Sequence, residues 1–259
     1  MNNPLTVPFI KVEAENLPRA WEISVMKCLT EGIEIKTEYD KEEDPPSLDC
    51  SMVISVTNPF NEPRIHKCIP CGIGDLTFYS LEVTDGIHDD WIAPEEGKWS
   101  YTYHQRLKDQ IPYIVDTLVE TPYSRRAQAI TWDITHDTIL YPDHTPCLQR
   151  LWFRIINDEL IMSASMRSND AFKAAFMNMY AFTNLQKDIA KEISKRIGYD
   201  INVGQYNHVV DSYHIYGSYF GEIEKFVASL GKRKFEDRVY YTEEVQFFID
   251  EINKQWGKE

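Results

Sequence analysis

Hydrophobic residues recur with a helical period in four segments of the chain. The first segment starts at a capping residue, Asn16, and stops at Gly32, while the longest starts at Asp170 and stops at Gly198. The stripe of the longest segment is broad and apolar, so a globular core would bury it. The predicted helices cover residues 16–30, 170–198, 220–230 and 243–256.

Short runs rich in β-branched and aromatic residues predict strands between these helices. They lie at residues 51–56, 127–132 and 151–156, and the last is followed by Asn157-Asp158 and a second run, which is the pattern of a hairpin. Helices that flank such runs predict an α+β fold, with helices packed on a mixed sheet. The acidic, Pro-containing segment 38–46 is expected to be an exposed loop.

Composition and charge exclude several classes of protein. The 259 residues include 43% hydrophobic residues, enough for a sizeable core. The net charge of −14 opposes binding to nucleic acid or to an anionic membrane. We expect a cytoplasmic protein, because no apolar run is long enough to span a bilayer and the five cysteines are an odd number.

Cys147 is the first candidate for chemistry. It follows a loop of turn residues and precedes a predicted strand, where a thiolate can be exposed at one end and supported at the other. A single cysteine is more often a small core residue, so its context matters. Three arginines supply that context, because Arg125, Arg126 and Arg167 all lie beside serines at the ends of predicted elements, and arginine suits phosphate.

Cys68-Ile69-Pro70-Cys71 is a CxxC motif. One such pair, with no second pair and no pair of histidines nearby, is weak evidence for zinc or redox chemistry. From the sequence we interpret both cysteines as structural, and we expect no metal.

These residues together resemble the thymidylate synthase superfamily, over roughly residues 91–216. The resemblance is carried, in matching order, by Ser124-Arg125-Arg126, Pro146-Cys147, Arg167-Ser168-x-Asp170, Asn178 and His214-Ile215-Tyr216. It implies a single thymidylate synthase-like catalytic domain over residues 1–259, which forms a homodimer through its sheet. It also implies transfer of a one-carbon unit from 5,10-methylenetetrahydrofolate to C5 of a pyrimidine nucleoside 5′-monophosphate.

The resemblance assigns a role to each matching residue. Cys147 adds to C6 of the base, which makes C5 nucleophilic. Tyr101 belongs to a proton-transfer network, and Glu82 is the candidate general acid or base. For the nucleotide, Arg167 and Ser168 bind the phosphate, Asn178 the base, and His214 and Tyr216 the sugar. Arg125 and Arg126 bind the phosphate in the neighbouring subunit. The residues that face the folate are Asp170, His88 and Trp91.

Departures from the family pattern bear on the reaction. Leu148, Trp152 and Met166 stand where the family usually has His, Gln and Gln, and His88 stands where a tryptophan stacks on the folate. A smaller, polar residue there favours attack by water on the exocyclic methylene, which gives a hydroxymethyl group in place of a methyl group. We therefore expect 5-hydroxymethylation of CMP or dCMP, as in the divergent branch that includes archaeal-type synthases and nucleoside-antibiotic hydroxymethylases.

Two alternatives stay open at this point. One is reductive methylation of dUMP to dTMP, which the amide of Asn178 suits because it can present a donor and an acceptor to uracil. The other is a nucleotide-binding protein without catalysis, and retention of Cys147 speaks against it. His214 and Tyr216 fit ribose and deoxyribose equally well.

Overall fold

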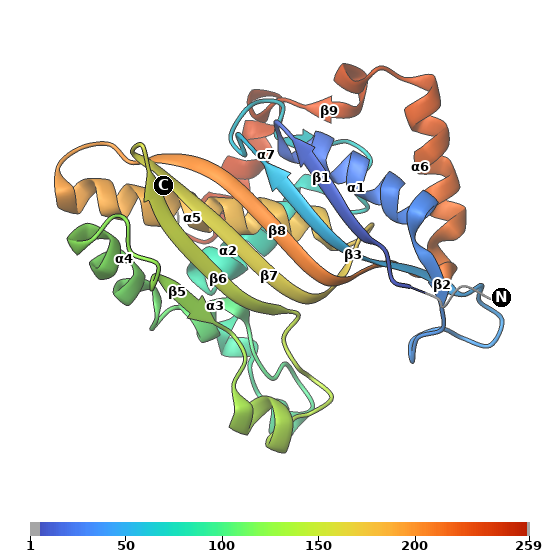
Figure 1. Cartoon of the computed structure of the whole chain (residues 1–259), viewed down its shortest axis with the longest axis horizontal. Coiled ribbons are helices and arrows are strands. Elements are labelled where there is room, and N and C mark those ends of the chain that lie inside the picture. Colours follow the sequence, from blue (N-terminus) through green and yellow to red (C-terminus); the bar gives the residue numbers. More distant parts are fainter. Residues whose placement is uncertain (1–5, 258–259) are drawn as a thin grey trace.

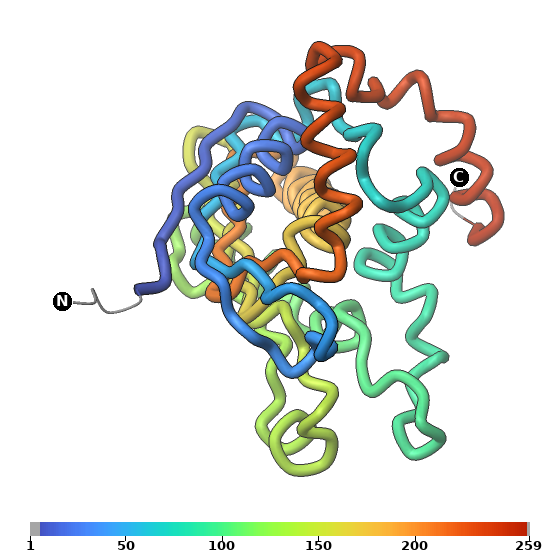
Figure 2. Tube along the Cα trace, turned by 90° about the vertical axis from the view of Figure 1, so that its right-hand side faces the viewer, coloured from blue at the N-terminus to red at the C-terminus, as the bar shows by residue number. Residues whose placement is uncertain are grey.

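The computed structural model describes residues 6–257, and its centre is a mixed sheet backed by helices. In Figure 1 the strands lie in front and α1, α2, α5 and α7 pass behind them, so the near face of the sheet carries no helix. Figure 2, turned by 90°, has α2, α6 and α7 on one side of the strands. Within residues 6–257 no helix is long and apolar enough to cross a membrane.

The main sheet has seven strands, in the order β1-β3-β8-β7-β6-β5, with β2 added alongside β3. The pairs β1–β3 and β7–β8 are parallel and the other pairs are antiparallel, so the predicted mixed sheet is confirmed. A small second sheet pairs β4 with β9. The strands are β1 Phe9–Ala14, β2 Ile33–Ile35, β3 Ser47–Val56, β4 Ile65–His66, β5 Gln128–Ile130, β6 Leu148–Ile156, β7 Glu159–Asp170, β8 Asn202–Ile215 and β9 Val239–Tyr240.

The long helix α5 lies against the covered face of the sheet, and its apolar stripe is buried as its period predicts. Phe176, Met179 and Phe182 are each at most 1% exposed. The helices are α1 Leu17–Glu31, α2 Ile73–Asp85, α3 Tyr103–Leu107, α4 Ile111–Glu120, α5 Ala175–Ile197, α6 Phe220–Lys232 and α7 Thr242–Gln255.

Local signals in the sequence explain several element boundaries. The side chain of Asn16 accepts a hydrogen bond from the backbone N–H of Arg19 at 3.1 Å and caps α1, as predicted. The β6–β7 hairpin turns at Asn157 and Asp158, which both take positive φ angles (51° and 59°). Gly198 ends α5 with a φ of 83°.

The prediction that Asp170 caps the long helix is wrong. Strand β7 continues to Asp170, which pairs with His214 of β8, and the helix begins only at Ala175. The Asp170 carboxylate accepts hydrogen bonds from the backbone N–H groups of Phe172 and Lys173 at 2.9 and 2.8 Å, so it caps the turn between strand and helix. Residues 167–170 consequently lie at a strand end and not at a helix N-terminus.

Two elements that matter for the site were not predicted. Strand β8 has buried residues at every second position, but its other face carries polar residues such as Gln205 and Asn207, which weakened the apolar signal. The apolar pattern of α2 is also broken by polar residues, so the helix was not predicted from the sequence. This helix matters because it carries Tyr79 and Glu82.

Candidate active site

Cys147 immediately precedes β6 and lies beside the end of β7. Its sulfur is 3.5 Å from the hydroxyl oxygen of Ser168, and its carbonyl accepts from the backbone N–H of Arg167 at 2.9 Å. A cavity of about 290 Å³ opens at this point. The predicted residues that line it are Cys147, Ser168, Asp170, Asn178, His214 and Tyr216.

The Arg167 side chain is exposed at the edge of this region. Its Nε donates to the carbonyl of Pro146 at 3.1 Å and its Nη2 to the carbonyl of Thr145 at 2.9 Å. These bonds hold the guanidinium beside the segment that leads into Cys147. A fixed cation next to a cysteine favours the thiolate and also suits an anionic ligand.

Tyr79 of α2 is a residue of the cavity that the sequence did not reveal. Its hydroxyl donates to Oδ1 of Asn178, which is only 5% exposed. Burial, aided by the nearby Glu82 carboxyl, raises the pKa of Tyr79 well above its usual range, so the hydroxyl keeps the proton that it donates. This bond fixes the orientation of the amide, so that its N–H₂ group is a donor that Asn178 can offer to a ligand.

His214 is oriented by its own strand and by β3. Its Nδ1 lies 3.2 Å from the carbonyl of Ser212, and the Ser212 hydroxyl donates to the carboxylate of Asp49. Asp49 faces His214 across the β3–β8 pair, and burial raises its pKa. Asp211, adjacent to Ser212 in sequence, is exposed because neighbouring strand residues point to opposite faces. Asp49 therefore supplies a carboxylate near His214 that the sequence did not indicate, in addition to Asp170, which pairs with His214 from β7.

A second cavity, of about 330 Å³, lies next to the first and shares Tyr79 and Tyr103 with it. Glu82 and Tyr101 line this cavity. Burial raises the pKa of Glu82, although a hydrogen bond with His88 opposes the shift. Burial is the main cause that raises the pKa of Tyr101 above its usual range. The nearby Cys147 adds to this shift, and Arg167 opposes it. Both groups consequently favour their protonated forms, and Tyr101 lies near the nucleophile.

An aromatic cluster surrounds His88 on the outer side of Glu82. The His88 ring stacks on Trp91 at 3.9 Å between centroids, and its Nδ1 is 2.9 Å from Oε2 of Glu82. Trp99 and Trp256 approach the same imidazole edge-on, at 5.8 and 6.0 Å. Three tryptophans therefore pack around the imidazole that stands where the family has a tryptophan.

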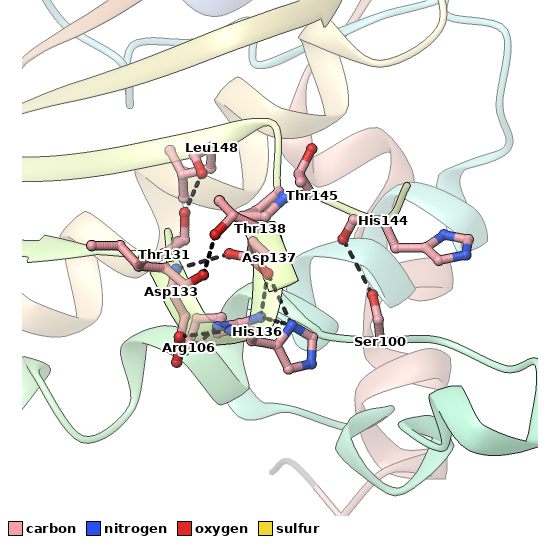
Figure 3. A network of polar contacts seen from close by, with 12 residues as sticks. Ser100, Arg106, Thr131, Asp133, His136, Asp137, Thr138, His144, Thr145 and Leu148 are labelled. Carbon is pink, nitrogen blue, oxygen red and sulfur yellow. Dashed lines mark hydrogen bonds and ion pairs between the residues drawn. The ribbon is translucent and has the colours of Figure 1, made fainter. Parts of the chain in front are cut away.

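A buried ion pair braces the segment that leads to Cys147 (Figure 3). Arg106 of α3 donates to the carboxylate of Asp137 at 2.7 Å, and Asp137 is only 1% exposed. The carboxylate also accepts from the backbone N–H of Asp133 at 2.8 Å. The Arg106 guanidinium also lies 5.8 Å from the centre of the Tyr101 ring, so the same side chain contacts both the segment and the phenol.

Arg125 and Arg126 lie away from this cavity in the same chain. Strand β5 pairs antiparallel with β6, Gln128 opposite Trp152, which places Arg126 beside the far half of β6. The separation from Cys147 is about seven residues along β6, or roughly 23 Å at the usual rise of a strand. The structure thus gathers Arg167 with the nucleophile and leaves the other two arginines elsewhere.

The acidic segment 38–46 is exposed, as expected, but it also meets the site. The Tyr39 ring, 68% exposed, lies edge-on to Tyr216 at 6.2 Å. A Cβ on Gly217 would come within 1.8 Å of the Pro45 carbonyl oxygen, so this position requires a glycine. Among residues 6–257 no group of His, Cys, Asp and Glu side chains is arranged to hold a metal ion.

Comparison with known proteins identifies the family. The family model for thymidylate synthase matches residues 85–239. A protein named "Putative thymidylate synthase" from Methanocaldococcus jannaschii is 30% identical over 217 residues, 79% of this chain and 90% of that protein. One of the same name from Methanosarcina mazei is 33% identical over 208 residues, 77% of this chain and 89% of that protein.

A solved structure shares the fold. Thermostable thymidylate synthase A from Bacillus subtilis superposes with a TM-score of 0.59 over 81% of this chain and 83% of that chain, at 20% identity. The mixed sheet backed by helices is therefore the thymidylate synthase-like α+β fold, as the sequence predicts. Together with the family match, this likeness shows that the chain belongs to the thymidylate synthase family, enzymes that transfer a one-carbon unit to a pyrimidine nucleotide.

Proposed function

We propose that this enzyme methylates C5 of dUMP reductively, using methylenetetrahydrofolate. The hydrogen bond from Tyr79 to Asn178 carries this proposal. With its oxygen held by Tyr79, Asn178 offers an N–H donor to the base edge. The O4 of uracil accepts such a bond, whereas the amino group of cytosine is itself a donor. This preference reverses the expectation of a cytidine substrate, and the names of the archaeal relatives support the same reaction.

The aromatic cluster around His88 fits a folate. It lines a cavity of about 430 Å³ that also reaches Glu82 and Tyr79, next to the nucleotide cavity. Flat heteroaromatic rings stack on tryptophan and imidazole faces, and Trp91 and Trp256 are 47% and 39% exposed here. Methylenetetrahydrofolate supplies the one-carbon unit and, in methylation, the hydride. A folate stacked on these side chains would exclude water from the reacting carbon.

The residues of the chain account for the remaining chemistry. The Cys147 thiolate adds to C6 of the base, and the electron pair displaced to C5 lets that carbon attack the one-carbon unit. Glu82, whose raised pKa makes its carboxylate a stronger base, accepts in its ionised form the proton that C5 must lose, and Tyr101 lines the same cavity. When the product forms, Cys147 leaves C6 and the ring double bond returns. The thiolate is therefore regenerated in each cycle.

Arg167 and Ser168 are the proposed phosphate residues of the same chain, and Arg125 and Arg126 those of a second chain. The roughly 23 Å between Arg126 and Cys147 supports this division, because the arginines cannot serve their own site. The face of the sheet without helices supports a dimer, since Gln205, Asn207 and Val209 of β8 are only partly covered there. Such a dimer would bring each pair of arginines to the partner's cavity.

Hydroxymethylation of a cytidine nucleotide is the second candidate. One observation favours it: His88 and Glu82 form a hydrogen-bonded pair that lines the outer cavity and can activate a water molecule. In that reaction water, and not hydride, ends on the exocyclic carbon. The folate then leaves as tetrahydrofolate.

One assay separates the two reactions. The protein is incubated with methylenetetrahydrofolate and each of dUMP, UMP, dCMP and CMP, and dihydrofolate is followed by its absorbance. The proposal expects dihydrofolate with dUMP, together with a product heavier by one methylene unit. A hydroxymethylated product without dihydrofolate would establish the second candidate instead. The variant Cys147→Ala serves as the control, because neither reaction proceeds without the thiolate.

A further inference from the structure

Three polar side chains form a buried chain of hydrogen bonds that ends at the cavity of Cys147. The hydroxyl oxygen of Tyr206 lies 2.7 Å from Nδ1 of His208, and Nε2 of His208 lies 2.7 Å from Oδ1 of Asn169. Tyr206 and His208 are 0% exposed and Asn169 is 3% exposed. Asn169 lines the cavity, yet the proposed reaction gives it no role. Buried polar groups that are paired in this way hold one another in a single arrangement.

The protons along this chain of hydrogen bonds run in one direction. Burial lowers the pKa of His208 to about 3, so the imidazole is neutral and has one N–H and one bare nitrogen. If Nδ1 carried the proton, it would donate to Tyr206 and leave the proton of that buried hydroxyl without this acceptor, which is costly. The Tyr206 hydroxyl therefore donates to Nδ1, and Nε2–H donates to Oδ1 of Asn169.

The direction of these bonds determines what Asn169 presents to the cavity. Because Oδ1 faces His208, the N–H₂ group occupies the other branch of the amide and is a donor for a ligand. The centre of the His208 ring is 6.5 Å from that of Phe182, which follows Asn178 by one turn of α5. Tyr103, which also lines the cavity, lies 5.9 Å from the same phenyl ring. The donor consequently belongs to the end of the cavity that carries the amide of Asn178.

We propose that Asn169 is a second amide that binds the pyrimidine: its N–H₂ group donates to a ring carbonyl, and Tyr206 and His208 are positioning residues that hold it in that orientation. This inference rests on the proposed function only in placing a pyrimidine nucleotide in this cavity. Uracil offers the carbonyls O2 and O4, and cytosine offers O2. A donor whose direction is set before the ligand arrives loses little freedom on binding, so it contributes to affinity for a carbonyl.

Binding of a nucleotide and of its base-free counterpart tests the proposal. The dissociation constants of dUMP and of 2-deoxyribose 5-phosphate are measured by calorimetry without folate, in the wild type and in Asn169→Ala. We expect the constant for dUMP to rise about 2- to 12-fold, the range for loss of one neutral hydrogen bond, and that for the sugar phosphate to stay the same. An unchanged constant for dUMP, or an equal rise for both ligands, would overturn the proposal. Asn202→Ala, the same change at an exposed residue of β8 outside the cavity, should alter neither constant.

A second substitution decides the question if Asn169→Ala does not fold. Asn169→Asp has the same shape and keeps the oxygen that accepts from His208, but it lacks the N–H₂ donor. The dissociation constant of dUMP, divided by that of the sugar phosphate, should rise at least as much as expected for alanine, and a ratio equal to the wild-type value would contradict donation to the base. In this variant dCMP distinguishes the two carbonyls. An equal loss for dUMP and dCMP assigns O2, whereas tighter binding of dCMP through its amino group assigns O4.

Tyr206→Phe tests the positioning role separately. It keeps the ring and removes the hydroxyl that fixes the proton on Nε2 of His208, so the amide of Asn169 can turn and present its oxygen. We expect part of the base-dependent loss of Asn169→Ala, and no further loss when both changes are combined. Additive losses in the double variant, or an unaltered constant for dUMP in Tyr206→Phe, would refute this role.

These binding experiments are independent of the methylation assay. They contain no folate, so a protein that does not methylate dUMP can still show the base-dependent loss. If that assay identifies dCMP as the substrate, dCMP takes the place of dUMP in the same comparison. Absence of the loss with the nucleotide that is turned over would overturn the role of Asn169 alone.

Discussion

The hydrogen bond between Tyr79 and Asn178 makes a quantitative prediction about base selectivity. The change Tyr79→Phe removes one hydroxyl and keeps the ring. It leaves Oδ1 of Asn178, a residue 5% exposed, without the donor that fixes the amide. A buried hydrogen bond of this kind contributes about 0.5–1.5 kcal/mol net. A free-energy difference of about 1.4 kcal/mol changes an equilibrium constant tenfold, so the preference for uracil over cytosine should fall about 2- to 12-fold.

The assay compares kcat/KM for dUMP with the inhibition constant of dCMP, in the wild type and in Tyr79→Phe. In the variant the amide can turn and present its oxygen to the amino group of cytosine, so dCMP should bind more tightly while dUMP is used less well. Tyr199→Phe is the matched control, because it makes the same chemical change at a residue 52% exposed and outside the cavity. If the ratio of the two constants stayed at the wild-type value in Tyr79→Phe, the reasoning about base selectivity would be refuted.

Three further predictions concern the nucleophile, the dimer and stability. Cys147→Ala should abolish turnover while dUMP binding stays measurable by calorimetry, and residual turnover would contradict a covalent mechanism. Mixing inactive Arg126→Ala and Cys147→Ala subunits should restore part of the activity if each site takes arginines from its neighbour, and no restoration would speak against shared sites. Burial lowers the pKa of His208 from 6.5 to about 3, so between these values the unfolded chain binds one more proton. The free energy of unfolding should then fall by about 1.4 kcal/mol per unit of falling pH from this group, and thermal unfolding of His208→Gln should show a shallower loss.

Much of the fold could be predicted because its signals are local. The cap at Asn16, the turn at Asn157 and Asp158 and the apolar stripe of α5 all act within a few residues, and each predicted element is present. The start of α5 was predicted five residues early, because pairing between Asp170 and His214 extends β7. That pairing joins distant parts of the chain, so no local pattern reports it.

The candidate site, like the fold, could be predicted only where its residues stand in short motifs. Cys147, Ser168, Asn178 and His214 were predicted from short motifs, and the structure gathers them around one cavity. Asp49 escaped notice because it reaches His214 only through cross-strand pairing.

Tyr79 and the contacts of Trp99 and Trp256 with His88 escaped notice for a related reason. Tyr79 approaches Asn178 only through the packing of α2 on α5. The prediction that a polar His88 favours water compared single positions, whereas the His88 ring also contacts Trp99 and Trp256, in addition to the predicted Trp91. Selectivity that depends on such long-range contacts cannot be inferred from the spacing of residues along the chain.

The fate of the hydride tests the central proposal most directly. Methylenetetrahydrofolate that carries deuterium at its hydride-donating position is incubated with dUMP and the enzyme, and the nucleotide product is analysed by mass spectrometry. Reductive methylation predicts a product whose methyl group contains one deuterium, with one equivalent of dihydrofolate. A hydroxymethyl product without deuterium, whose oxygen derives from labelled water, would contradict the account.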